Sequence, residues 1–193
     1  RGLGCEIVDG GWIPDDPGAT RRALTLGARE SDLVLTSGGV SVGDEDHVRA
    51  AVEELGSLDL WRVAVKPGKP IAFGRIGVAA FVGLPGNPVS AFVTFCLFVR
   101  PFILRLQGMT EVMPRVFPVT AGFERRIAGE RREYLRARLT TIDGQLYAEV
   151  YPQQGSGVLT SVVWAEGLVD VPPGELVKHG HPVHFIPFSE LIA

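Results

Sequence analysis

The feature that most constrains the fold is a continuous apolar run, DLVLTS, that leads into the glycine-rich stretch SGGVSVGDED and then into the amphipathic sequence HVRAAVEELG. An uninterrupted apolar strand is typical of a sheet that is buried on both faces. Glycines between a strand and a helix let the backbone adopt positive φ and turn its amides toward a ligand. Short apolar runs and amphipathic helices alternate in this way up to about Thr110. The pattern predicts an α/β layer with a largely parallel sheet.

The other elements of this first part follow from the same alternation. A helix is expected in DDPGATRRALTLGARE, with Asp16 capping its free amides and Pro17 in its first position. The remaining predictions are strands at residues 5–8, 60–65, 71–76 and 79–82, the last two joined by a turn at Gly77, and a long apolar helix over residues 89–106.

After Pro114 the pattern changes to period-two runs such as VFPVTAGF, EYLRARLT and QLYAEVY, separated by turns at Asp143-Gly144 and at PPG. This pattern is typical of antiparallel strands joined by tight turns. We therefore expect two domains, an α/β domain over residues 1–113 and a small all-β domain over residues 114–193.

Composition and charge limit the possible partners. With 46% hydrophobic and 21% charged residues, the chain has the composition of a globular protein, and its formal net charge of −3 does not favour nucleic acid as a ligand. The longest apolar stretches, such as residues 91–99, are shorter than the roughly 20 residues of a membrane span. We expect no nucleic-acid or membrane partner, a cytoplasmic location, and buried free thiols at Cys5 and Cys96.

The loop SGGVSVGDED is the first candidate for chemistry. It lacks the patterns of a dinucleotide fingerprint and of a P-loop. Three acids, Asp44, Glu45 and Asp46, end the loop and would repel a bound phosphate unless a cation bridges them, a task that suits magnesium. The alternative is a tight turn in which Asp46 only caps the next helix.

Two further loops carry groups that suit an anion. The chain has three lysines and 16 arginines, yet Lys66 and Lys69 lie three residues apart in the rigid turn KPGKP. A compact ammonium suits an oxyanion that is held without a bidentate guanidinium, although a solvated turn is the alternative. In GLPGNPVSAF, Asn87 can cap a helix that begins at Pro88, and Ser90 lies in its first turn, where its hydroxyl can reach an anion.

The all-β part is less informative. Four arginines lie in GERREYLRARL and one serine, Ser156, lies in YPQQGSG, and a solvated face explains either feature when it is taken alone. The sequence KHGHPVH contains three histidines, but a strand there makes side chains alternate in direction, so we expect no zinc site.

Taken together, SGGVSVGDED, KPGKPIAFG and GLPGNPVSAFVTF, with WIPDDP upstream and RREYLRARL and QGSG downstream, closely resemble the molybdopterin molybdenumtransferases, the MoeA and gephyrin E-domain family. The resemblance implies a molybdopterin-binding α/β domain of the MoaB/MogA type, without its first strand and helix, followed by a β-barrel domain. These are the third and fourth domains of that family. The two preceding domains are missing, so we expect this segment alone to be incomplete as an enzyme.

The resemblance also implies an activity, the magnesium-dependent insertion of molybdate into adenylylated molybdopterin with release of AMP, in a homodimer. It implies that the pterin phosphate is held by Ser37, Gly38, Gly39, Val40 and Ser41. The molybdate would be surrounded by Lys66, Lys69, Pro70 and Ser90, together with Arg131 and Ser156 from the β domain. Magnesium would be bound by Asp46 and Asp15, with Asp16 as the alternative to Asp15.

Two other functions remain open. The gephyrin relative also anchors membrane receptors through this region, so the chain can instead be a non-catalytic interaction module. The related molybdopterin adenylyltransferases share the α/β fold, but the β domain and the KPGKP and GLPGNP loops argue against that assignment.

Overall fold

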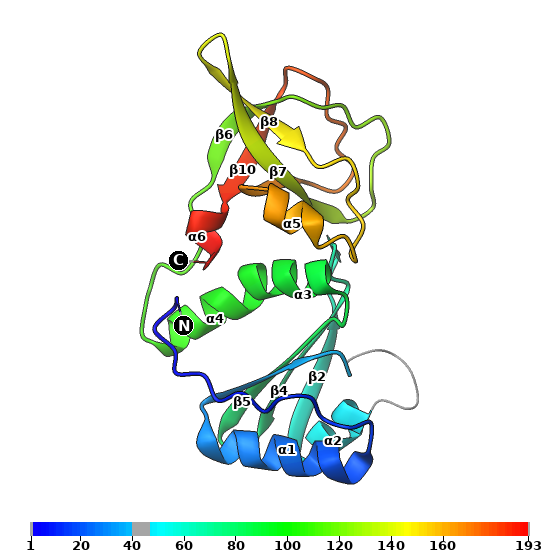
Figure 1. Ribbon diagram of the computed structural model, residues 1–193, viewed down its shortest axis with the longest axis vertical. Helices are drawn as coiled ribbons and strands as arrows, with labels where there is room; N and C mark the ends of the chain where they lie inside the picture. The colour runs from blue at the N-terminus through cyan, green and yellow to red at the C-terminus, as the bar shows by residue number, and fades with distance from the viewer. Residues whose placement is uncertain (1, 40–46, 193) are drawn as a thin grey trace. The chain divides into compact units, whose positions relative to one another are not determined.

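The computed structural model describes residues 2–39 and 47–192 (Figure 1). Its elements, in chain order, are α1 (Pro17–Glu30), β1 (Leu33–Ser37), α2 (His47–Leu55), β2 (Gly56–Arg62), β3 (Val65–Lys66), β4 (Pro70–Ile76), β5 (Ala79–Leu84), α3 (Pro88–Thr94), the π-helical segment η1 (Phe95–Val99), α4 (Arg100–Leu106), β6 (Phe117–Ala121), β7 (Arg132–Ile142), β8 (Gln145–Val150), α5 (Thr160–Trp164), β9 (Gly167–Val171), β10 (Pro182–Pro187) and α6 (Phe188–Ile192).

Contacts divide the chain into two compact units. The first unit contains Leu3–Val63 and Lys69–Asn87, and the second contains Ala64–Gly68 and the residues from Pro88 onward. The KPGKP turn therefore crosses from the second unit to the first between its two lysines. The boundary expected near residue 113, between an α/β domain and an all-β domain, stays a prediction.

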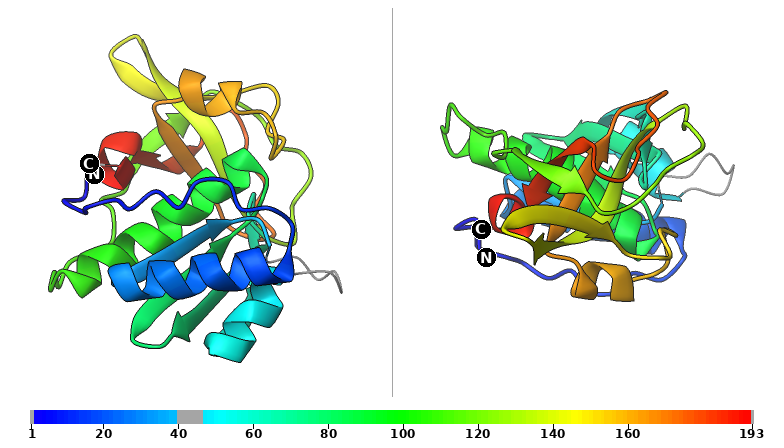
Figure 2. Two further views of the ribbon diagram at one scale, coloured as in Figure 1. Left: turned by 60° about the horizontal axis from the view of Figure 1, so that its bottom comes forward. Right: turned by 90° about the horizontal axis from the view of Figure 1, so that it is seen from above.

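The first unit is an α/β layer whose sheet has the strand order β1-β5-β4-β2. Only β1 and β5 are parallel, whereas β4 runs antiparallel to both β5 and β2. The expectation of a largely parallel sheet is therefore wrong in this detail, because a two-residue turn containing Gly77 (φ 58°) folds β5 back on β4 as a hairpin. Helices α1 and α2 cover one face of the sheet (Figure 2, left), and Leu24, Val52 and Phe81 are buried there.

The expected strand at residues 5–8 does not form. This segment has no regular secondary structure, and Ile7 and Val8 are 56% and 58% exposed. Among the described strands, β1 pairs only with β5 and leaves its other edge unpaired. Residues 5–8 pair with no described strand, so they form no ladder of backbone hydrogen bonds.

Local sequence signals explain how α1 begins and how α2 ends. The Asp16 carboxylate accepts a hydrogen bond of 2.6 Å from the Ala19 amide, and Pro17 is the first helical residue, so the predicted cap of α1 is confirmed. Helix α2 ends at Leu55, before Gly56. A Cβ on Gly56 would lie 1.9 Å from the Arg75 carbonyl oxygen, so this residue must be glycine for β2 to approach β4.

The second unit contains the predicted all-β part. Its six strands have the order β3-β7-β8-β6-β10-β9, and a further pairing of β7 with β9 closes the sheet into a small barrel. The turn between β7 and β8 has positive φ at Asp143 and Gly144, as the sequence predicts. Val119, Ala137, Val169 and Phe185 are buried in the barrel core. The α/β class with a following β barrel is confirmed.

The long apolar helix also belongs to the second unit by its contacts. It spans Pro88–Leu106 with a mean hydropathy of 1.8. By length and composition alone this helix could cross a membrane, so the expectation that every apolar stretch is too short is wrong. In this structure the helix packs in a core, with Val93 and Cys96 in one cluster with Leu168 and Ile186. Burial raises the pKa of the Cys96 thiol to about 12. The other thiol, Cys5, is half-buried instead of buried.

Candidate functional site

Three of the motif loops meet at one edge of the first unit's sheet. Ser37 at the end of β1 lies opposite Leu84 at the end of β5, so the loops that follow these parallel strands leave the sheet side by side. The Gly38 amide donates a hydrogen bond of 2.9 Å to the Leu84 carbonyl oxygen. Strand β4 runs antiparallel to β5 and begins at Pro70, so the end of the KPGKP turn lies at the same edge.

The glycines at this edge have conformations that other residues rarely adopt. Gly38 and Gly39 have φ of 88° and 70°. A Cβ on Gly38 would lie 4.0 Å from the Cα of Gly86, so the two loops touch through their glycines. Successive glycine amides in such conformations are a common way to bind an anion. Val40, Ser41 and Asp46 lie outside the described residues.

The structure separates the two acids of the IPDDP motif. The Asp16 carboxylate is used as the helix cap of α1. The Asp15 side chain is 96% exposed, and its Oδ1 lies 3.7 Å from Nε2 of His47, the residue that follows Asp46 in the sequence. Asp15 is therefore the acid of the pair whose carboxylate does not cap α1. Its oxygens suit magnesium, which needs only one or two carboxylates beside substrate phosphates.

Lys66 lies in the second unit, on strand β3. This strand pairs in parallel with β7, so that Lys66 lies opposite Glu133. The Lys66 ammonium is 3.4 Å from the Glu133 carboxylate, and its side chain is 48% exposed. Lys69 is exposed and belongs to the first unit.

Arg131, Ser90 and Ser156 also belong to the second unit. Arg131 donates a hydrogen bond of 3.2 Å to the carbonyl oxygen of Val65, beside Lys66. Ser90 is buried in the first turn of α3, and a Cβ on Gly68 of the KPGKP turn would be 3.6 Å from the Ser90 carbonyl oxygen. The Ser156 carbonyl oxygen accepts a hydrogen bond of 3.1 Å from the Val89 amide. The start of α3 thus contacts both loops.

The sequence did not distinguish Arg136 from the other arginines of its strand. Arg136 is 1% exposed, and its guanidinium donates hydrogen bonds to the Ser161 hydroxyl (3.0 Å) and the Gly155 carbonyl oxygen (3.2 Å). Burial lowers the pKa of Arg136 to about 10, so it is protonated at neutral pH. No carboxylate pairs with it among the described ion pairs. A buried cation therefore contacts the loop that carries Ser156.

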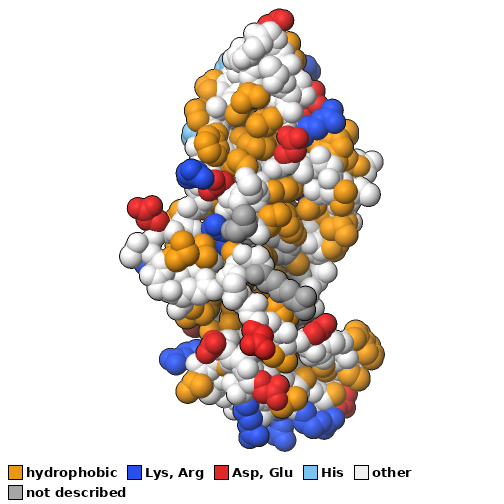
Figure 3. All heavy atoms as spheres, turned by 60° about the vertical axis from the view of Figure 1, so that its left-hand side comes forward, with side chains coloured by type: hydrophobic (Ala, Val, Ile, Leu, Met, Phe, Trp, Pro, Cys, Tyr) orange, Lys and Arg blue, Asp and Glu red, His pale blue; other side chains and the backbone are white. Residues whose placement is uncertain are grey.

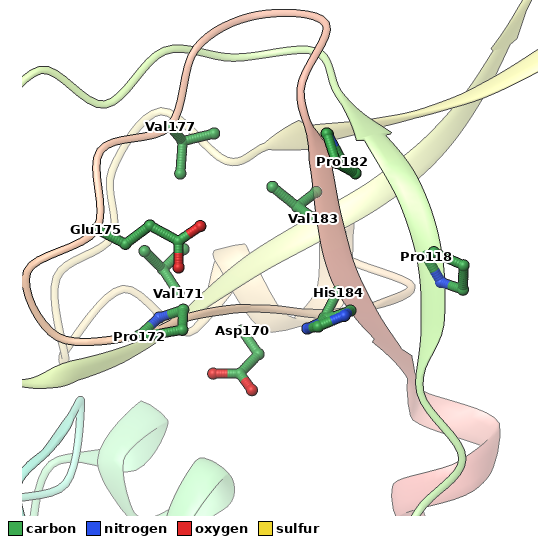
Figure 4. A pocket seen from close by; sticks show the side chains of 9 residues that line it. All are labelled: Pro118, Asp170, Val171, Pro172, Glu175, Val177, Pro182, Val183 and His184. Atoms are coloured by element: carbon green, nitrogen blue, oxygen red, sulfur yellow. The ribbon is translucent and has the colours of Figure 1, made fainter.

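Two hollows lie away from these loops. One, of about 220 Å³, lies on the β barrel and is lined by Pro118, Asp170, Val171, Pro172, Glu175, Val177, Pro182, Val183 and His184 (Figure 4). Its two carboxylates do not favour an oxyanion. The other lies along α1, where basic side chains gather at the lower end of the molecule in Figure 3, and is lined by Arg21, Arg22, Thr25, Leu26, Arg29 and Leu55. Neither hollow includes a predicted site residue.

Two families of known proteins match consecutive parts of this chain. Residues 1–105 match the family described as a probable molybdopterin binding domain, and residues 118–188 match the MoeA C-terminal region, domain IV. The chain belongs to the MoeA family. Membership accounts for both the strand-end loops of the first unit and the barrel of the second.

Individual relatives are similar over most of this chain. A protein from Haemophilus influenzae named molybdopterin molybdenumtransferase is 37% identical over 98% of the chain, which spans 48% of that relative. The molybdenum cofactor synthesis protein cinnamon of Drosophila melanogaster is 40% identical over 73% of the chain and 24% of its own length. A solved MoeA structure from Pyrococcus horikosii is 28% identical with a TM-score of 0.76, over 96% of this chain and 44% of that one. The chain spans about half the length of the Haemophilus influenzae and Pyrococcus horikosii relatives and about a quarter of cinnamon.

Proposed function

We propose that this chain is part of an enzyme of molybdenum-cofactor biosynthesis that inserts molybdate into adenylylated molybdopterin and releases AMP, with magnesium. The observation that carries the proposal is the meeting of the loops after β1 and β5 and the start of β4 at one sheet edge, because open α/β sheets bind ligands at such an edge. The name molybdopterin molybdenumtransferase among the relatives supports the same activity.

In this proposal the pterin phosphate is bound by the backbone of the loop after β1. Gly38 and Gly39 have the positive φ that such a loop requires, which supports their assignment. Ser37 ends the strand and is exposed there, so its hydroxyl can reach the same ligand. Val40 and Ser41 are assigned with them from the sequence motif alone.

Molybdate is a tetrahedral dianion that cationic and hydroxyl groups can hold. We assign Lys66, Lys69, Pro70, Ser90, Arg131 and Ser156 to its surroundings. To these we add Arg136, because its buried guanidinium lies against the loop of Ser156 and has no described acid partner. These groups orient and stabilise the anion electrostatically, without a covalent nucleophile.

Magnesium, when bound, neutralises the charge that develops on the phosphoanhydride as AMP leaves. Asp15 and Asp46 are the residues that we assign to hold it. The exposed carboxylate of Asp15, free of the capping bond that Asp16 makes, supports the choice of Asp15. His47 beside Asp15 can hold that carboxylate in place.

The whole enzyme requires more than this chain in our proposal. We expect a homodimer located in the cytoplasm, in which preceding domains complete the site. The purified chain is then expected to bind molybdate and molybdopterin but to release little AMP from adenylylated molybdopterin.

The test measures binding and turnover separately. Calorimetry of the purified chain with molybdate, and with adenylylated molybdopterin with and without magnesium, is expected to show binding. AMP release is expected to rise strongly when the upstream half of the Haemophilus influenzae relative is added. Absence of any anion binding would overturn the proposal and favour the interaction module, and full turnover by the chain alone would contradict the need for further domains.

A further inference from the structure

Glu133 is a buried carboxylate that no part of the proposed reaction uses directly. Its side chain is only 7% exposed, and it lies on β7 opposite Lys66 of β3. Arg125 binds both of its oxygens, with distances of 2.5 Å and 2.6 Å. A buried carboxylate held in this bidentate way has a fixed position.

The surrounding loop is shaped around this carboxylate. A Cβ on Gly129 would lie 2.7 Å from Oε1 of Glu133 and 3.0 Å from Nη2 of Arg125, so a side chain there would push against the pair. Burial by itself would raise the pKa of Glu133, but hydrogen bonds from Arg125 and the charges of Arg125 and Lys66 lower it overall. Glu133 is therefore ionised at neutral pH.

Lys66 is the more exposed partner of Glu133 in this cluster. Its ammonium is 3.4 Å from Oε1 of Glu133, while 48% of its side chain remains exposed. A lysine ammonium has three donors, so one contact to Glu133 leaves others for a ligand. Because Arg125 already neutralises Glu133, the cluster presents one net positive charge, and Lys66 is its most exposed cation.

We propose that Glu133 is a positioning residue, which holds the ammonium of Lys66 in place for an incoming oxyanion. A free lysine loses rotamer freedom when it binds a ligand, whereas a lysine that is already held loses less. This inference rests on the proposed function only for the identity of the anion. The contact between Glu133 and Lys66 can be tested without any ligand.

A second buried acid provides a matched control. Asp170 on β9 is 9% exposed and is bound in the same bidentate way by Arg132, at 2.6 Å and 2.7 Å. It contacts no lysine among the described ion pairs. Asp170→Asn therefore removes a comparable buried ion pair from the same sheet and leaves Lys66 and Glu133 unchanged.

The first measurement is NMR relaxation of the lysine side chains in the 193-residue chain, labelled with ¹³C at lysine Cε. The chain has three lysines, Lys66, Lys69 and Lys178, so three signals are expected. In Glu133→Gln the Lys66 signal is expected to show faster motion while the other two stay unchanged. In Asp170→Asn all three are expected to stay unchanged. Unchanged relaxation of Lys66 in Glu133→Gln would overturn the proposal.

The second measurement is a double-mutant cycle on molybdate affinity, measured by calorimetry. Glu133→Gln is expected to weaken binding about fivefold to tenfold when Lys66 is present, the range for a rotamer-rich side chain that loses its anchor. The same change is expected to alter binding less than twofold in a Lys66→Ala background. Equal effects in both backgrounds would show that Glu133 does not act through Lys66.

A second variant and a titration of the unmodified chain distinguish failure of this inference from failure of the proposed function. If Glu133→Gln does not fold, Glu133→Asp keeps the charge but is too short to reach both partners, and the same relaxation change is expected. If molybdate shifts none of the lysine signals in the unmodified chain, the proposed function fails. The ligand-free relaxation result then still decides whether Glu133 holds Lys66.

Discussion

The sheet edge of the first unit and the charged cluster of the second unit suit anions by different means. At the edge, Gly38 and Gly39 adopt positive φ and the loops after β1 and β5 touch through glycine, so the backbone forms the site. In the cluster, the charged side chains of Lys66, Glu133 and Arg125 determine the electrostatic environment of the KPGKP turn. A backbone site is sensitive to an added Cβ, whereas a side-chain site is sensitive to a changed charge. Substitutions can therefore test the two regions independently.

The largest effect is expected from the two lysines of the KPGKP turn, Lys66 of the charged cluster and Lys69 of the first unit. Replacing Lys66 and Lys69 together by Ala should lower molybdate-dependent product formation by about a hundredfold or more in the reconstituted enzyme, the scale for removing donors that stabilise an oxyanion. Folding should change little, since exposed substitutions alter stability by about 0.5 kcal/mol or less. Lys178→Ala is the control, because Lys178 is also exposed but lies in neither loop. Unchanged molybdate dependence in the double variant would remove both lysines from the site.

The sheet edge of the first unit is tested by adding a single Cβ to one of its glycines. Gly38→Ala should weaken molybdopterin binding by about fivefold to thirtyfold, because a residue with a side chain at φ of 88° costs roughly 1–2 kcal/mol. Gly77→Ala is the matched control in the same unit, with φ of 58° and no atom near its added Cβ. Both variants should unfold at lower temperature in calorimetry, but only Gly38→Ala should lose binding. Equal binding by the two variants would mean that the loop after β1 is only a turn.

The two acids at the start of the first unit should separate into a metal ligand and a helix cap. Asp15→Ala should raise the magnesium concentration for half-maximal turnover about tenfold, since a carboxylate ligand is lost. Asp16→Ala should lower the free energy of unfolding by about 1 kcal/mol through loss of the cap, with no change in the magnesium requirement. A magnesium titration and a urea denaturation curve for each variant check this. The opposite pattern would exchange the two assignments.

The smallest effect concerns acid stability of the charged cluster. The pKa of Glu133 is lowered from its usual 4.5, so its contribution to stability is present above that pH and is lost as the pH falls through the lowered value. Wild-type protein should lose more stability than Glu133→Gln between pH 6 and pH 3. Urea denaturation at the two pH values measures the difference. An equal loss in both proteins would show that Glu133 gains nothing from its partners.

Several features of the first unit could be predicted from sequence because they depend on neighbouring residues. The cap at Asp16, the hairpin turn at Gly77 and the long helix that begins at Pro88 all follow from local backbone chemistry. Residues 5–8 could not be predicted in this way, because their composition suits a strand but a strand also requires a partner. The same limit applies to the mixed sheet, since the direction of β5 depends on how the hairpin pairs with β1.

The candidate site was predictable as a set of loops but not as a set of side-chain contacts. Strand ends and glycines identified the loops after β1 and β5, whereas the strand RREYLRAR did not indicate which arginine is buried. Buried and exposed side chains do not simply alternate along β7, because both of its faces contain buried residues, Leu135 and Arg136 among them. The partner of Lys66 was equally hidden, because β3 and β7 are far apart in the sequence.

The hydrogen bond from the Val89 amide to the Ser156 carbonyl oxygen has a consequence for how this family can vary in length. Surface loops usually accept insertions, but the loop over residues 154–156 is attached at each residue: Gln154 and Gly155 bind Arg136, and Ser156 binds the start of α3. An inserted residue would shift all three attachments at once. The turn at Asp143-Gly144 is exposed and has no such attachment among the described hydrogen bonds. Natural insertions and deletions in this domain should therefore accumulate at the β7–β8 turn and be rare between Gln154 and Ser156.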